Sequence, residues 1–230
     1  MKILLFDIDG TLIDSGGAGK LAMETAIASE FGLGVPTMAI PYAGRTDRAI
    51  IADLLRHYDV EASPANVERI LNAYLGHLPH CLKQRPGHAL PGVRALLESL
   101  AVRSDVLLGL LTGNVEAGAV NKLTFFNLHH YFACGGFADK WVERNDVARA
   151  ARQRAELHLG RTIDETVSLW VIGDTPHDVT CGRVIGARVL AVATGSHSVD
   201  QLLSSQPDHV VADLSDTERI LALWETGSHQ

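Results

Sequence analysis

The chain has 230 residues, of which 47% are hydrophobic and 20% charged, and its formal net charge is −7. This length allows one large domain, or a core with a modest second domain, around a sizeable buried interior. The negative charge argues against a nucleic-acid partner, because binding to a phosphate backbone requires a basic face. The three cysteines are widely spaced without a C-x-x-C motif, and no stretch approaches the roughly 18 apolar residues of a membrane span. We therefore expect a cytoplasmic protein with reduced thiols that binds neither nucleic acid nor membrane.

Apolar segments typical of strands alternate along the chain with segments typical of helices. The strands are predicted at residues 2–8, 105–111, 168–172, 188–192 and 208–211. The helices between and after them are predicted at residues 92–101, 115–127, 146–158, 178–185, 199–203 and 217–224. Such alternation produces βαβ units, so the sequence predicts an α/β fold, a Rossmann-like parallel sheet with helices on both faces.

Residues 15–86 interrupt this alternation. Helical patterns occur there at residues 21–31, 48–58 and 64–81, without a convincing strand. A segment of roughly 70 residues is long for a connection between strands of one sheet. We interpret it as a small helical cap subdomain inserted into an α/β core formed by residues 1–14 and 87–230, with glycine-containing hinges at the two junctions.

The first predicted strand leads directly into two aspartates. Asp7 and Asp9 flank Ile8 and are followed by a Gly-Thr turn. Residues two apart in a strand project to the same side, so both carboxylates can point to the carboxyl end of the sheet, where open parallel sheets bind ligands. A solvated turn explains one such aspartate, but it does not explain the pair.

Polar residues also follow two other predicted strands. Thr112-Gly113-Asn114 separates the strand at 105–111 from a helix, which places a hydroxyl and backbone amides at a helix N-terminus, as in phosphate sites. The same tripeptide is also typical of a plain capping turn. Asp174 and Asp178 follow the strand at 168–172, at the start of another helix, where acidic residues are favourable even without a ligand.

If these strands are neighbours, four carboxylates converge on one crevice. They belong to Asp7, Asp9, Asp174 and Asp178. Their mutual repulsion requires a cation, and a site made only of oxygen ligands suits Mg²⁺. A metal that faces a hydroxyl and a helix N-terminus forms a site for a phosphoryl group.

In this combination the chain resembles the haloacid dehalogenase-like hydrolases, most closely their phosphoglycolate phosphatase-like branch. Residues 7–12, 111–114 and 173–178 are similar to three of that family's motifs, in the same order, and the helical block after the first motif is similar to its mobile cap. The resemblance implies a Mg²⁺-dependent phosphatase that acts on a small phosphorylated metabolite, phosphoglycolate-like or a sugar phosphate.

The resemblance also implies a role for each motif residue. Asp7 would be the nucleophile that forms an aspartyl-phosphate, and Asp9 would protonate the leaving oxygen and then deprotonate the attacking water. The implied phosphoryl-binding groups are Thr112 and the amides of Gly113 and Asn114. The implied magnesium ligands are Asp7, the carbonyl of Asp9, Asp174 and Asp178.

The family's remaining motif is a basic residue that neutralises the phosphoryl group. Many relatives carry Lys-Pro in the place where this chain has Glu143-Arg144-Asn145. Lys122 is one candidate, because it lies on the helix after Asn114 and a helical side chain leans towards the N-terminus. Arg144 is the other candidate. A lysine on a helix is also often only a solvated surface charge.

Residues 42–48 resemble the cap loop that contacts the leaving group in this family. Arg45 and Arg48 in that loop would pair with a carboxylate or a second phosphate on the substrate. Two surface arginines at the start of a helix are an equally good interpretation.

Two other functions are compatible with the same scaffold. A phosphomutase of the β-phosphoglucomutase type usually has a cap histidine where this chain has Gly19. The other alternative is a catalytically silent binding or regulatory member of the fold. The intact set of Asp7, Asp9, Thr112 and Asp174 argues against it, because such a protein would not need these residues.

Overall fold

The computed structural model describes residues 1–33 and 40–225. Residues 34–39, within the predicted cap, and residues 226–230, at the end of the predicted core, lie outside the described part. In that part, a parallel sheet has the strand order β5-β4-β1-β6-β7-β8. Its strands are β1 (Lys2–Phe6), β4 (Val106–Leu111), β5 (Cys134–Gly136), β6 (Ser168–Gly173), β7 (Arg188–Val192) and β8 (His209–Val211). The predicted α/β fold with a parallel sheet is therefore confirmed.

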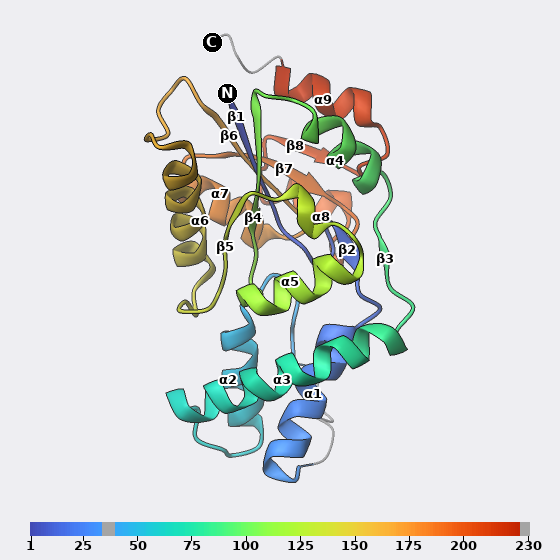
Figure 1. Cartoon of the computed structure of the whole chain (residues 1–230), viewed down its shortest axis with the longest axis vertical. Coiled ribbons are helices and arrows are strands. Elements are labelled where there is room, and N and C mark those ends of the chain that lie inside the picture. Colours follow the sequence, from blue (N-terminus) through green and yellow to red (C-terminus); the bar gives the residue numbers. More distant parts are fainter. Residues whose placement is uncertain (34–39, 226–230) are drawn as a thin grey trace.

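Helices cover both faces of this sheet (Figure 1). Alternate residues of β1 explain why: Ile3 and Leu5 belong to one buried apolar cluster, and Leu4 and Phe6 belong to another. The first cluster includes α6 (Arg144–Leu159) and α7 (Pro176–Val184). The second includes α4 (Val93–Ala101), α5 (Glu116–Phe125) and α9 (Thr217–Glu225). The short α8 (Val199–Leu203) precedes β8, and a 3-10 turn, η1 (His129–Tyr131), precedes β5.

The sequence patterns do not predict strand β5. Its residues, Cys134-Gly135-Gly136, lack an apolar run, and glycine is a poor strand former. The strand forms because the edge of β4 is available, with Gly109 paired to Cys134 and Leu111 paired to Gly136. Tertiary pairing therefore overrides local propensity at this edge.

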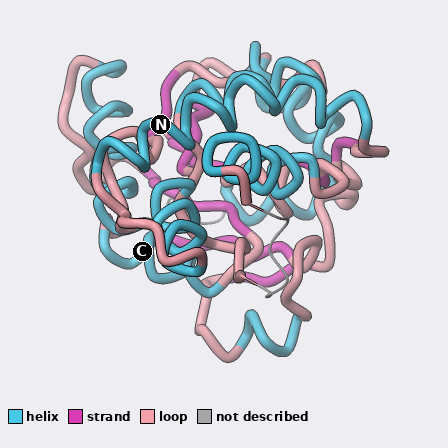
Figure 2. The backbone as a smooth tube through the Cα atoms, turned by 90° about the horizontal axis from the view of Figure 1, so that it is seen from below, coloured by secondary structure: helices cyan, strands magenta, loops and turns pink. Residues whose placement is uncertain are grey.

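Three helices lie together at the end of the molecule opposite the N-terminus and α9 (Figure 1; Figure 2 views the molecule from this end). They are α1 (Ala18–Phe31), α2 (Asp47–His57) and α3 (Pro64–Gln84). Side chains before α2 and α3 cap these two helices: Thr46 Oγ1 accepts from the amide of Ala49 at 3.1 Å, and Ser63 Oγ accepts from the amide of Asn66 at 3.4 Å. None of the described helices is long and apolar enough to cross a bilayer.

A short two-stranded ribbon connects the helical block to the sheet. Strand β2 (Ile13–Asp14) pairs antiparallel with β3 (His88–Ala89). The segment that enters the helical block therefore lies beside the segment that leaves it. The predicted division at residues 14 and 87 falls at this ribbon. One apolar cluster extends from Phe6 in the sheet to Tyr74 in the helical block, so the separation of core and cap remains our interpretation.

Candidate active site

The site forms where three neighbouring strands end. Strand β1 pairs with β4 on one side and with β6 on the other, with Phe6 in register with both Leu110 and Ile172. Asp7, Thr112 and Asp174 follow the three strands directly. The parallel register therefore brings together motifs that are far apart in the sequence.

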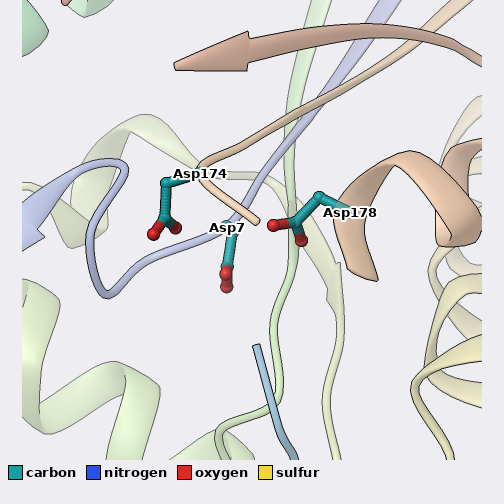
Figure 3. Close-up of side chains that lie close together, drawn as sticks. All are labelled: Asp7, Asp174 and Asp178. Carbon is teal, nitrogen blue, oxygen red and sulfur yellow. The ribbon is translucent and has the colours of Figure 1, made fainter. Parts of the chain in front are cut away.

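Three buried carboxylates meet at this edge of the sheet. One oxygen each of Asp7, Asp174 and Asp178 lies within 4.8 Å of the others, and Figure 3 shows the three side chains converging. Asp178 points back from the first turn of α7, where its Oδ2 accepts from the Thr175 amide at 3.0 Å and from the Thr175 hydroxyl at 2.8 Å. The fourth predicted carboxylate, that of Asp9, is not part of this group.

The backbone encloses the carboxylate of Asp174 tightly. A Cβ atom on Gly10 would lie 2.5 Å from Asp174 Oδ2, and one on Gly195 would lie 1.7 Å from the same oxygen. Gly10 also has a φ of +87°, which side chains other than glycine rarely adopt. The hydroxyl of Thr11 donates to Asp174 Oδ1 at 3.2 Å. These contacts fix the position of the carboxylate.

Burial and like charge make two of these carboxylates, those of Asp7 and Asp174, costly to ionise. Burial raises the pKa of Asp7 to about 7, against the attraction of Arg144, and the charge of Asp178 raises it further. Burial and the charges of Asp178 and Asp7 raise the pKa of Asp174 to about 8. A cation would relieve this repulsion, and a set of oxygen donors fits Mg²⁺.

Arg144, at the start of α6, is the cation nearest to the acidic group. Its Nη2 lies 3.6 Å from Asp7 Oδ2 and also donates to Asp178 Oδ1. The side chain is only 8% exposed, and its Nε has no hydrogen-bond partner within the described structure. One of the two predicted candidates therefore faces Asp7.

Lys122, the other candidate, is buried and faces Asp9. Its Nζ donates to Asp9 Oδ2 at 2.6 Å and to Asn114 Oδ1 at 2.7 Å, while Asn114 Nδ2 donates to the same Asp9 oxygen at 2.9 Å. The side chain reaches back along α5 towards its N-terminus, as expected for a helix. Lys122 is therefore not a solvated surface charge, and the side chain of Asn114 has a contact that the sequence analysis did not anticipate.

The loop after β4 places polar groups next to the carboxylates of Asp7 and Asp9. Thr112 Oγ1 accepts from Asn114 Nδ2 at 2.8 Å and from the Asn114 amide at 3.3 Å, which leaves the Thr112 hydroxyl hydrogen free to donate. The Gly113 amide makes no hydrogen bond with any described residue. Thr112 and Gly113 are thus the groups available to bind an anion, whereas the Asn114 amide is used within the loop.

The segment before α2 docks onto this loop. The Asp47 amide donates to the Gly113 carbonyl at 2.7 Å, and Asp47 Oδ2 accepts from the Val115 amide at 2.9 Å. The Thr46 hydroxyl donates to the Val142 carbonyl at 2.6 Å. Within the predicted cap loop at residues 42–48, only Arg45 and Arg48 were selected from the sequence, because a Thr-Asp pair at a helix start is typical of ordinary capping. The helical block therefore covers the site.

The two predicted cap arginines have partners within the protein. Arg45 Nη2 lies 2.6 Å from Asp53 Oδ2. Arg48 pairs with Glu68 and donates from Nε to the Asp139 carbonyl at 2.6 Å. A contact of either arginine with a substrate remains a prediction, and a contact through the guanidinium would require it to share or leave its carboxylate.

A cavity of about 260 Å³ lies between the sheet edge and the helical block. The catalytic and phosphoryl-binding candidates are among its lining residues: Asp7, Asp9, Thr112, Gly113, Asn114, Lys122, Arg144 and Asp174. The helical block contributes Tyr42, Asp47 and Tyr74 among others. A group held by Thr112 and Gly113 at Asp7 would extend into this space, which is the arrangement of a hydrolytic site with a covering subdomain.

Comparison with known proteins agrees with this class. Residues 4–192 match the family described as haloacid dehalogenase-like hydrolase. Because the match covers most of the sequence, the chain belongs to the haloacid dehalogenase-like hydrolase family and is an enzyme. The resemblance inferred from the three motifs is confirmed.

Individual relatives cover nearly the whole chain. It is 26% identical over 225 residues to a probable phosphatase, IndB, of Dickeya dadantii (strain 3937), which covers 93% of this chain and 90% of the relative. It is 26% identical over 223 residues to a phosphoglycolate phosphatase of Aquifex aeolicus (strain VF5), covering 96% and 97%. The crystal structure of a hydrolase from Pseudomonas syringae has the same fold, with a TM-score of 0.71 at 22% identity over 97% of this chain and 99% of that one. The predicted phosphoglycolate phosphatase-like branch is thus confirmed.

Proposed function

We propose that this enzyme is a Mg²⁺-dependent phosphatase that hydrolyses a small phosphorylated metabolite through an aspartyl-phosphate on Asp7. The observation that carries the proposal is the position of the Asp7 carboxylate, next to Arg144 and to the free donors of Thr112 and Gly113. These groups match the charge and the acceptors of a phosphoryl group. The phosphatase names of the relatives support the same reaction.

Asp7, Asp174 and the carbonyl of Asp9 would hold the metal. Both oxygens of Asp178 already accept hydrogen bonds, from Thr175 and Arg144, so we assign Asp178 a supporting contact within the metal site. When bound, Mg²⁺ would neutralise the phosphoryl oxygens and so allow a dianion to approach the Asp7 carboxylate.

The side chains of this chain account for the remaining chemistry. An Asp7 oxygen attacks phosphorus while the bond from phosphorus to the leaving oxygen breaks, and Asp9 gives that oxygen a proton. Water then attacks the aspartyl-phosphate and gives a proton back to Asp9, which regenerates both carboxyl groups. Lys122 and Asn114 hold Asp9 Oδ2, and Asp9 Oδ1 has no hydrogen-bond partner in the described structure, so Oδ1 is the oxygen available for proton transfer.

The two cations have separate tasks in this proposal. Arg144 faces Asp7 and would neutralise the transferring phosphoryl group, which is the role of the family's basic motif residue. Lys122 faces Asp9 and would orient it. From the sequence, Lys122 and Arg144 were alternatives for a single role, and we propose that both contribute.

The alternatives receive less support from the site. A Cβ atom at Gly19 would lie 3.2 Å from Lys122 Nζ, so the position where mutases carry a histidine is here in close contact with the lysine that holds Asp9. Buried carboxylates that repel one another lower the stability of the fold. A silent binding protein would have no need to keep them.

Release of inorganic phosphate from p-nitrophenyl phosphate, a generic phosphatase substrate, tests the proposal. We expect release with Mg²⁺, none with EDTA, and none from Asp7→Asn, which keeps the shape of the side chain but removes its charge. Asp59→Asn is the matched control, because Asp59 is exposed and lies outside the cavity. Equal activity of Asp7→Asn and the control in pure preparations would remove Asp7 as the nucleophile.

A further inference from the structure

The cap side of the cavity carries a carboxylate. Asp47 is only 5% exposed and is one of the residues that line the cavity. The Val115 amide occupies its Oδ2, whereas Oδ1 has no hydrogen-bond partner among residues 1–33 and 40–225. Because Oδ1 is not one of the fully buried unpartnered side-chain atoms of the described structure, it is open to the cavity and can accept a hydrogen bond from a bound molecule.

Two tyrosine hydroxyls on this side, those of Tyr42 and Tyr74, also have no hydrogen-bond partner in the described structure. Tyr74 comes from α3 and is fully buried. Burial, together with the charges of Asp47 and Asp9, raises the pKa of Tyr74, so the hydroxyl keeps its proton and can both donate and accept.

The cations that line the cavity near these groups each lie beside an acidic residue. The pairs are Arg45–Asp53 at 2.6 Å, Lys122–Asp9 at 2.6 Å and Lys20–Glu24 at 3.8 Å. A negatively charged substituent on the substrate would therefore meet Asp47 without an unpaired cation to compensate. Burial raises the pKa of Asp47 to about 7 against the attraction of Lys122, so its carboxylate is charged chiefly above about pH 7.

We propose that the leaving group is an uncharged, hydroxyl-bearing alcohol, as in a sugar or polyol monophosphate, and that Asp47 and Tyr74 recognise its hydroxyl groups. This inference rests on the proposed phosphatase function and narrows its substrate class. A substrate hydroxyl donates to Asp47 Oδ1 and another accepts from Tyr74, which gives both groups a partner. Because the Tyr74 hydroxyl is fully buried, its side chain or the cavity wall must shift to make this contact. A carboxylate or second phosphate in the same place would lie against the ionised form of Asp47, so anionic leaving groups such as glycolate are selected against.

The apolar wall of the cavity is consistent with this class. Met23, Ile50 and the ring of Tyr42 line it, and such side chains pack against the carbon skeleton of a bound alcohol. A site that hydrogen-bonds a substrate hydroxyl discriminates strongly against an analogue that lacks this hydroxyl, because the polar groups of the protein then remain without a partner.

The test compares kcat/KM for glycerol, pentose and hexose monophosphates with kcat/KM for phosphoglycolate and pyrophosphate, with p-nitrophenyl phosphate as a reference for the chemistry. For the wild type we expect the best sugar or polyol phosphate to exceed phosphoglycolate by about tenfold or more. In Asp47→Asn the values should move in opposite directions, down for the sugar phosphate and up for phosphoglycolate, because the repelling charge is lost. A purely structural role of Asp47 would lower both values.

Tyr74→Phe removes only the hydroxyl. We expect it to lower kcat/KM for the best sugar phosphate by about tenfold and to leave that for p-nitrophenyl phosphate within about twofold. Asp59→Asn and Tyr131→Phe make the same chemical changes outside the cavity and serve as matched controls.

The outcomes separate the two levels of the proposal. Hydrolysis of p-nitrophenyl phosphate, together with a wild-type preference for phosphoglycolate or pyrophosphate, would overturn the inference but leave the phosphatase function standing. An unchanged substrate ratio in Asp47→Asn would do the same. Absence of hydrolysis of every compound with Mg²⁺ present would overturn the phosphatase function, and the inference with it.

Discussion

Lys122 and Arg144 neutralise different carboxylates, although both could be proposed from the sequence for a single role. Lys122 holds Asp9 and Asn114, and Arg144 holds Asp178 and lies near Asp7. The two basic side chains come from helices α5 and α6, so only the folded arrangement of these helices assigns each cation its partner.

Removing the charge of Lys122 should impair the chemistry that depends on Asp9. In Lys122→Met, a side chain of similar length keeps the packing but no longer orients Asp9, and we expect kcat for p-nitrophenyl phosphate to fall by about 10²-fold. Steady-state kinetics measure the change. Lys140→Met is the matched control, because Lys140 is exposed and does not line the cavity. An unchanged kcat in Lys122→Met would show that Asp9 needs no such support.

Removing Arg144 should destabilise the fold as well as the site. Arg144→Ala would leave the buried carboxylates of Asp7 and Asp178 without their cation, and breaking such a buried pair costs about 3–5 kcal/mol. Denaturant unfolding in EDTA would measure the loss. Mg²⁺ should restore part of it. A variant as stable as the wild type in EDTA would mean that the ion pairs contribute nothing to the fold.

At the scale of elements, much of the arrangement follows from sequence patterns. The strands that carry the motifs were predictable because apolar runs end in Asp, Thr and Gly. The helix after the third motif was predicted at residues 178–185, whereas α7 begins at Pro176, because the capping box of Thr175 and Asp178 starts the helix earlier. The edge strand β5 was not predictable, since its Cys-Gly-Gly sequence forms a strand only when β4 is present. Asp47 was not selected either, because its role depends on contacts with Gly113 and Val115, which lie far along the chain.

Gly195, in the loop after β7, leaves room for the carboxylate of Asp174 because glycine has no side chain. Gly195→Ala would place a methyl group 1.7 Å from Asp174 Oδ2 in the present geometry, so either the loop or the carboxylate must move. We expect the Mg²⁺ concentration for half-maximal activity to rise by about tenfold, measured by titration of the metal.

Gly76→Ala is the matched control for this substitution. Gly76 lies within α3, and a Cβ atom there would meet no other atom within 4 Å. Alanine should therefore leave the metal dependence unchanged and stabilise the protein by up to about 1 kcal/mol. Equal metal affinity in both variants would contradict the tight enclosure of Asp174.

At the scale of the whole molecule, the acidic group couples stability to pH and to metal. The pKa values of Asp7 and Asp174 rise from 3.8 to about 7 and about 8, so the metal-free folded chain keeps protons that the unfolded chain releases. The contribution of these groups to the free energy of unfolding therefore falls as pH rises from about 4 to about 8.

Metal binding should reverse this trend, because it requires the ionised carboxylates. We expect the increase of Tm on addition of Mg²⁺ to be small near about pH 5.5 and to grow towards about pH 8. Thermal unfolding at a series of pH values, with Mg²⁺ or with EDTA, measures the increase. Asp174→Asn should lose the pH dependence of the increase. An increase that is the same at every pH would argue against the acidic group as the metal site.

The most direct test of the account is to trap the covalent intermediate. Rapid acid quenching during turnover, followed by peptide mass spectrometry, should find a phosphoryl group on the peptide that contains Asp7, and the adduct should be absent from Asp7→Asn. Asp9→Asn should accumulate more of it if Asp9 activates the water of the second step. Sustained turnover with no adduct at any quench time, or an adduct on a different residue, would contradict the proposed role of Asp7.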